Sequence, residues 1–152
     1  MELAAATHVR VSDDSAFFAL PEGQRGIFVG GGGSVRIARL ITAARMADMM
    51  LTGRTLSAND AERANFVQYI TPAGGTLLKA KELAARIAGN APLSNFAIIQ
   101  ALPRIQDLAH DDGLFLESLM AAMTQTSGDA QERLRAFLEK RADRLEAPPR
   151  KD

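Results

Sequence analysis

Cysteine and tryptophan are absent from the 152 residues of this chain. Without cysteine the chain can form no disulfide, offers no thiolate nucleophile and has no cysteine ligand for zinc. An excess of charge is also absent, because 18 lysine and arginine residues are matched by 18 aspartate and glutamate residues. The basic residues are scattered along the chain, so a surface that binds nucleic acid through its charge is not expected.

Long apolar runs are missing as well. No stretch approaches the ~20 residues that a membrane-spanning helix needs, and the first residues lack the basic segment and apolar core of a signal peptide. The two histidines, His8 and His110, stand apart without spaced carboxylates, so no metal site is expected. With 47% hydrophobic residues, the chain is predicted to be one soluble, cytoplasmic domain without a membrane partner.

Short strands and longer helices are both indicated by the pattern of residues. Segments rich in β-branched and aromatic residues predict strands at residues 7–11, 17–20, 27–29 and 66–70. Capping residues and apolar periodicity predict helices at residues 34–44, 58 onward, 77–88, 116–123 and 130–138. Pro103 is expected to break a helical segment at residues 94–108. Because so few strands cannot complete a sheet, the predicted fold class is α/β (α+β), mostly helical.

Four consecutive glycines, Gly30 to Gly33, stand between an apolar run and a predicted helix. A P-loop is excluded, because lysine and serine or threonine should follow the last glycine. A dinucleotide-binding fingerprint fails too, because Val35 stands where glycine or alanine is needed. Two interpretations stay open: backbone that closely approaches a ligand or water at a helix start, or a tight turn packed against a neighbour. Glu22, just upstream, is a candidate acid or base, or else a solvated turn residue.

Several short motifs follow one another along the chain: ELA at residues 2–4, FALPE at 18–22, GIFVGGGGS at 26–34, RI at 36–37, LTGR with LSA at 51–58, and AFLEKR at 136–141. Together they resemble the second half of the crotonase, or enoyl-CoA hydratase/isomerase, superfamily. The likeness extends to about residue 145 and is specific, because the motifs keep the family's order and spacing.

The resemblance implies an organisation for the chain. Residues 1–90 correspond to the C-terminal part of a crotonase-like spiral ββα core, residues 91–145 to the C-terminal oligomerisation helices, and residues 146–152 to a disordered tail. In the family, a glycine triplet stands directly before the x-Glu-Leu-Ala sequence, and Met1 is the x position here. We therefore expect this chain to lack the family's first half, which carries the oxyanion-hole amides and much of the CoA-binding surface.

The resemblance also implies a reaction, the hydration of a trans-2-enoyl-CoA thioester. Glu2 and Glu22 match the two catalytic glutamates that hold one water, and Gly30 is expected near that water. Phe137 and Lys140 match positions that touch the CoA of a neighbouring subunit, although Phe137 could equally be core and Lys140 a solvated residue. The expected partners are an acyl-CoA substrate and further copies of the chain, as a homotrimer or a dimer of trimers. No cofactor is expected, since the CoA thioester is the substrate.

Other functions agree with parts of this pattern. An enoyl-CoA isomerase can work with one of the two glutamates, an aryl-CoA hydratase-lyase shares both, and a non-catalytic remnant or oligomerising module needs neither. Three positions depart from the family pattern, with Val29 in place of proline and Asn65 and Arg133 in place of glycine. None of these departures removes a carboxylate, and the retention of both favours hydration.

Overall fold

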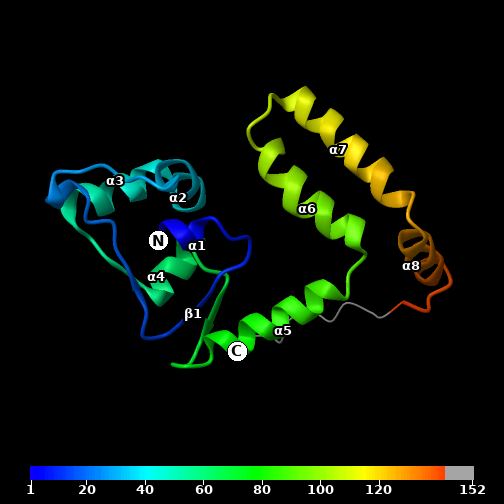
Figure 1. The fold of residues 1–152 in the computed structure, drawn as a ribbon, viewed down its shortest axis with the longest axis horizontal. Coiled ribbons are helices and arrows are strands. Elements are labelled where there is room, and N and C mark those ends of the chain that lie inside the picture. Colours follow the sequence, from blue (N-terminus) through cyan, green and yellow to red (C-terminus); the bar gives the residue numbers. More distant parts are fainter. Residues whose placement is uncertain (143–152) are drawn as a thin grey trace. The chain divides into compact units, whose positions relative to one another are not determined.

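The structure, a computed structural model, describes residues 1–142, which form two compact units, Met1–Ala85 and the described residues from Arg86 onward (Figure 1). The tail predicted at residues 146–152 lies outside the described residues. The first unit contains the strands and the short helices, and the second consists of helices. The prediction of a mostly helical chain is confirmed.

The first unit alternates helices with very short strands. Its elements in chain order are α1 (Glu2–Ala5), β1 (Val11–Asp13), β2 (Phe17–Phe18), the 3₁₀ turn η1 (Gly23–Arg25), α2 (Gly33–Ile41), α3 (Ala43–Thr52), β3 (Leu56–Ser57), α4 (Ala58–Arg63), β4 (Tyr69–Thr71) and α5 (Thr76–Ala88), which runs past the division. Strands β1 and β4 pair in parallel, with Val11 opposite Tyr69. Strands β2 and β3 pair antiparallel, with Phe17 opposite Ser57.

Apolar side chains at helical spacing form the core of the first unit. Ile37 and Ile41 lie one turn apart on α2, so both face the core, and Met49 of α3 packs in the same cluster. Phe66 is fully buried beside them, and its ring meets Phe18 edge to face with centroids 5.1 Å apart. Burying side chains of this size contributes about 1.5–3 kcal/mol each, which compensates for the small amount of sheet.

The second unit contains α6 (Pro92–Ile105), α7 (His110–Gln125) and α8 (Gly128–Leu138). Figure 1 shows α6 and α7 as an antiparallel pair joined by a short loop. The expected break at Pro103 is wrong, because α6 continues through this residue to Ile105. The missing amide of Pro103 falls in the last turn, where it costs one hydrogen bond close to the end of the helix. Within the described part of the chain, none of the helices combines the length and the apolarity of a membrane span.

All four strand predictions need correction, and the strand expected at residues 17–20 ends at Phe18. The strand expected at residues 7–11 begins at Val11, because Thr7 bonds back to the Ala4 carbonyl through its amide and its hydroxyl. Residues 27–29 form no strand, and residues 66–68 precede β4 instead of belonging to it. There the left-handed Asn65 (φ 63°) turns the chain so that the Phe66 amide bonds to the Ala61 carbonyl, closing α4.

The capping sequence predicted at the start of α4 is confirmed. The Asp60 amide donates to the Ser57 hydroxyl oxygen at 3.1 Å, and the Ser57 hydroxyl donates to the Asp60 carboxylate at 2.7 Å. This second bond is the main reason why the pKa of Asp60 lies below its usual value. A depressed pKa stabilises the fold above the ordinary range of aspartate, and that contribution is lost as the pH falls through the folded pKa.

We expect the Ser57→Ala substitution to lower the free energy of unfolding by about 1 kcal/mol at neutral pH, the typical value of an N-cap. The difference from the unmodified chain should shrink in acid, where Asp60 becomes protonated and the hydroxyl loses its charged acceptor. Urea unfolding measured over a pH series checks both statements. The control is Ser34→Ala inside α2, where alanine is the better helix former and no loss is expected.

Candidate active site

Glu2 is the first residue of α1, and it lies against the glycine run. Helix α1 packs on α2 through the buried Ala5, which brings the start of α1 to the start of α2. A Cβ atom built on Gly31 would lie 3.3 Å from Oε1 of Glu2, and one built on Gly33 would lie 3.0 Å from the same oxygen. The absence of side chains at these two glycines therefore creates the space that the Glu2 carboxylate occupies.

The glycine run serves two separate needs. Gly32 is the N-cap of α2 and has a left-handed backbone (φ 80°), a conformation that glycine adopts without strain. Gly33 is buried, and a Cβ there would meet Cγ2 of Val29 at 2.7 Å, so only glycine fits. Ser34, the first residue of the helix predicted at residues 34–44, lies inside α2, which begins at Gly33. Of the two interpretations, the tight turn packed against a neighbour thus applies to Gly31 and Gly33, and the neighbours are the side chains of Glu2 and Val29.

Gly30 is placed differently from its neighbours. No heavy atom lies within 4 Å of a Cβ built on it, and the residue is exposed. Its carbonyl accepts a hydrogen bond from the Gly33 amide at 2.8 Å, which closes the turn before α2. Gly30 therefore faces open space next to the two glycines that touch Glu2.

Glu22 precedes the turn η1, which packs against α3. A Cβ on Gly23 would lie 2.3 Å from the Met50 carbonyl oxygen, so the glycine after Glu22 allows η1 to sit on the end of α3. The Glu22 carbonyl accepts hydrogen bonds from the amides of Arg25 and Ile27, at 3.1 and 3.0 Å. Glu22 is thus held by its backbone, and its side chain is partly buried.

Glu2 and Glu22 share one unusual property. In each, one carboxylate oxygen is buried and has no hydrogen-bond partner: Oε1 of Glu2 and Oε2 of Glu22. Among the side-chain nitrogens and oxygens of the partly or fully buried residues that the structure describes, these are the two in this condition. An unpartnered buried oxygen costs about 1–3 kcal/mol, so two such groups in one small unit require an explanation. A water or substrate held by these oxygens supplies one.

A comparison with protein families identifies the family of the chain. The family model described as enoyl-CoA hydratase/isomerase matches residues 1–147. The chain belongs to this family. The resemblance expected from the short motifs is thereby confirmed.

Individual members of the enoyl-CoA hydratase/isomerase family are similar over nearly the whole chain. Enoyl-CoA hydratase EchA19 of Mycobacterium tuberculosis is 33% identical over 141 residues, which cover 93% of this chain and 53% of that protein. The 2,3-dehydroadipyl-CoA hydratase of Escherichia coli is 35% identical over 140 residues, or 92% of this chain and 55% of that protein. The chain therefore spans about half the length of the relatives that it matches.

A solved structure shows the same fold relationship. A provisionally named enoyl-CoA hydratase from Rhodopseudomonas palustris CGA009 superposes with a TM-score of 0.85 at 56% identity, covering 91% of this chain and 54% of that one. The short strands and helices of this chain therefore form part of a crotonase-type fold, as predicted.

Phe137 and Lys140, the predicted CoA contacts, lie in the second unit. Phe137 is on the last turn of α8 and is 68% exposed, which rules out the interpretation as a core residue within the described chain. Lys140 follows α8 with a left-handed backbone (φ 57°), and its amide donates to the Phe137 carbonyl at 3.0 Å. The two residues are thus linked through the backbone at the exposed end of α8, in a different unit from Glu2, Glu22 and Gly30.

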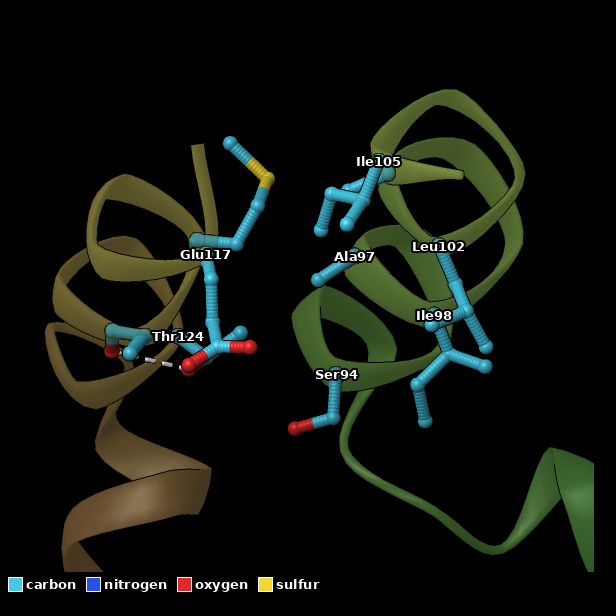
Figure 2. Close-up of a pocket in the computed structure, with 10 residues that line it drawn as sticks. Ser94, Ala97, Ile98, Leu102, Ile105, Glu117 and Thr124 are labelled. Carbon is cyan, nitrogen blue, oxygen red and sulfur yellow. Dashed lines mark hydrogen bonds between the residues drawn. The ribbon is translucent and has the colours of Figure 1, made fainter. Parts of the chain in front are cut away.

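The second unit also contains a groove between α6 and α7, with a volume of about 320 Å³. Figure 2 shows Ser94 and Ala97 of α6 pointing toward α7, with the Glu117 carboxylate extending from α7 into the space between the helices. Its lining is largely apolar, and none of the predicted site residues belongs to it. The groove is therefore not the site of the predicted chemistry.

Among the described residues, no group of histidines and carboxylates is arranged to hold a metal ion.

Gly33→Ala should disturb the site more than any other glycine substitution in the run. The new methyl group would meet Val29 at 2.7 Å and Glu2 at 3.0 Å, so α1 or the Glu2 side chain must move. We expect the nuclear magnetic resonance signals of α1 to shift and the free energy of unfolding to fall by about 1–3 kcal/mol, as for an overpacked core. Gly30→Ala is the matched control, because its methyl group would point into open space, and equal effects of both would contradict the geometry.

Proposed function

We propose that this chain carries the two catalytic carboxylates of an enoyl-CoA hydratase, which adds water to the double bond of a trans-2-enoyl-CoA thioester. The observation that carries the proposal is the pair of buried, unpartnered oxygens on Glu2 and Glu22. By the resemblance of the short motifs, both residues also match the family's two glutamates, and the chain belongs to that family. A water bound between the carboxylates would give each orphan oxygen a partner.

The chemistry assigns one task to each carboxylate. One glutamate accepts a proton from the water as the water oxygen bonds to C3 of the thioester. The other, protonated, delivers a proton to C2, so that hydroxyl and hydrogen are added across the double bond. General acid–base catalysis of this kind contributes ~10²–10⁴-fold to a rate. Retention of both carboxylates supports hydration over isomerisation, which can proceed with one.

The open space beside Gly30 is where we expect the substrate double bond and the catalytic water to lie. The Glu2 side chain occupies the space beside Gly31 and Gly33, whereas no heavy atom lies within 4 Å of a Cβ built on Gly30. A substrate carbon or the catalytic water can therefore approach the backbone at Gly30 without meeting a side chain. Glycine at this position would thus keep the approach to the carboxylates clear.

The proposed reaction also needs groups outside this chain. The relatives are about twice as long as the stretch they share with it. By the family resemblance, their first half supplies the amides of the oxyanion hole and much of the CoA site. We therefore propose hydratase activity for this chain in combination with such a first half.

A joined protein tests the proposal. The segment of the R. palustris protein that precedes its matched region is fused to Met1 of this chain, since 56% identity in the matched region favours correct packing. Crotonyl-CoA and 2,3-dehydroadipyl-CoA are the substrates, and loss of the conjugated thioester absorbance measures hydration. The unmodified R. palustris protein, assayed in parallel, is the reference. A folded joined protein that hydrates neither thioester while the reference is active would contradict the proposal.

We further propose that the second unit mediates association of the joined protein into trimers. Its helices expose large apolar side chains: Phe96, Ile98 and Leu102 on α6, Leu114, Phe115 and Leu119 on α7, and Leu134, Phe137 and Leu138 on α8. Apolar surface of this extent is typical of a protein interface. Light scattering at micromolar concentration should give a trimer or a multiple of it. Phe115→Ser and Leu119→Ser together should lower that mass, and a monomer before any substitution would contradict the proposal.

A further inference from the structure

Arg10 is the most deeply buried charged residue that the structure describes, with 7% of its surface exposed. It lies between α1 and β1. Arg10 is not among the residues for which the sequence predicts a role, although it stands inside the strand predicted at residues 7–11. Burial lowers the pKa of its guanidinium, because the charged form loses solvation.

The guanidinium connects two distant parts of the first unit through backbone carbonyls. Nη1 donates to the Thr7 carbonyl at 2.6 Å, and Nε donates to the Phe66 carbonyl. The guanidinium carbon also lies 5.7 Å from the centroid of the Phe66 ring. Around these bonds, the Arg10 amide donates to Oε1 of Gln68 at 3.0 Å, and the Gln68 amide donates to the Arg10 carbonyl at the same distance.

No carboxylate forms an ion pair with Arg10 in the described part of the chain. A buried charge without a counter-ion is costly unless its hydrogen bonds fulfil a need of the surrounding structure. Here both guanidinium bonds go to carbonyls, which carry partial negative charge. One of these carbonyls, that of Thr7, belongs to the turn that ends α1.

Helix α1 is too short to be stable without contacts such as the hydrogen bond from Arg10. It has four residues, far fewer than the ~12–15 that an isolated helix needs to persist in water. No side chain caps its first turn. At its other end, the amide and the hydroxyl of Thr7 both donate to the Ala4 carbonyl, at 3.1 and 2.8 Å, and Arg10 holds the Thr7 carbonyl. The hydrogen bond from Arg10 to the Thr7 carbonyl, which together with its bond to the Phe66 carbonyl is called the Arg10 clamp below, therefore lies at the opposite end of α1 from Glu2.

We propose that Arg10 is a positioning residue for Glu2: its guanidinium ties the end of α1 to the Phe66 carbonyl and so keeps the Glu2 carboxylate against Gly31 and Gly33. The inference rests on the proposed function of Glu2 as a catalytic group. Arginine suits this task because its planar fork reaches two carbonyls at once in fixed directions. Lysine has one compact ammonium group and can reproduce the hydrogen bonds to the Thr7 and Phe66 carbonyls only in part.

The first test measures the position of α1 in the full 152-residue chain. Arg10→Met should raise hydrogen exchange at the amides of Ala5, Ala6 and Thr7 by at least tenfold relative to α2, and weaken the nuclear Overhauser contact between Glu2 and Gly33. Arg10→Lys should fall between Met and the unmodified chain. Arg133→Met is the control, because Arg133 also donates to a carbonyl, that of Gly89, but in the second unit. An equal rise throughout the first unit would overturn the inference.

The second test is a double-mutant cycle in the joined protein, and it decides the question if the Arg10→Met chain folds poorly by itself. Arg10→Met should lower kcat for hydration by about 10- to 100-fold, the cost of a misplaced catalytic group, and change KM little. In a Glu2→Gln background the same substitution should have little further effect, because the group that it positions is gone. Equal losses in both backgrounds would show a merely structural role and overturn the inference.

The cycle also separates this inference from the function on which it rests. If Glu2→Gln leaves hydration unchanged, the catalytic role of Glu2 fails, and the positioning role of Arg10 fails with it. If Glu2→Gln abolishes most activity while Arg10→Met lowers neither kcat nor the order of α1, only the inference about Arg10 fails.

Discussion

Replacing Glu2 or Glu22 by glutamine in the joined protein should lower kcat for thioester hydration by a factor of ~10²–10⁴. Glutamine keeps the size of the side chain but neither accepts a proton from water nor delivers one to carbon. KM should change little, because the substitutions leave the surfaces that bind CoA intact. The loss should be similar for both residues if they serve the same water.

The measurement is steady-state hydration of crotonyl-CoA, with far-UV circular dichroism confirming that each variant is folded. Glu62→Gln on the exposed face of α4 is the control and should retain full activity. Removing the charge can also relieve the burial of an unpartnered oxygen, so both variants are expected to unfold at the same or higher urea concentration. Full turnover in both variants would remove the roles proposed for these carboxylates.

The chain made alone should show no significant hydratase activity, although it carries both glutamates. The thioester oxygen gains negative charge during the reaction, and the loss of one oxyanion-hole donor typically costs ~10²–10³ in rate. By resemblance, both donors lie in the half of the relatives that this chain does not match. Apolar side chains on the first unit, such as Leu3 at 86% and Phe28 at 74% exposure, also lack a covering surface within the described residues.

The chain alone and the joined protein are compared under the same assay conditions. Chemical-shift dispersion reports whether the chain alone is folded, and light scattering reports aggregation. We expect hydration only in the joined protein, and aggregation of the chain alone as its concentration rises, because its exposed apolar side chains lack a covering surface. A soluble, well-folded chain that hydrates crotonyl-CoA as fast as the joined protein would show that the first half is not needed for catalysis.

Local patterns in the sequence were sufficient for most helices and for the choice of candidate residues. The spacing of Leu134 and Leu138 indicated α8, and the sequence from Ser57 to Asp60 indicated the start of α4, because helix periodicity and capping depend on neighbouring residues. The order of the short motifs alone identified the family that the comparison confirmed. Helix α3 was overlooked, although Met46, Met49 and Met50 lie on one helical face.

The tertiary structure decided what those residues touch. The sequence indicated that bare backbone was needed at the glycine run, but only the packing of α1 on α2 revealed that Gly31 and Gly33 make room for Glu2. The Arg10 clamp was equally hidden, because its partner Phe66 is 56 residues away along the chain. Contacts of this kind depend on how distant segments fold together, so local sequence patterns do not predict them. The strand boundaries moved for the same reason, since hydrogen bonds of Thr7 and Asn65 outweighed the strand preference of the residues beside them.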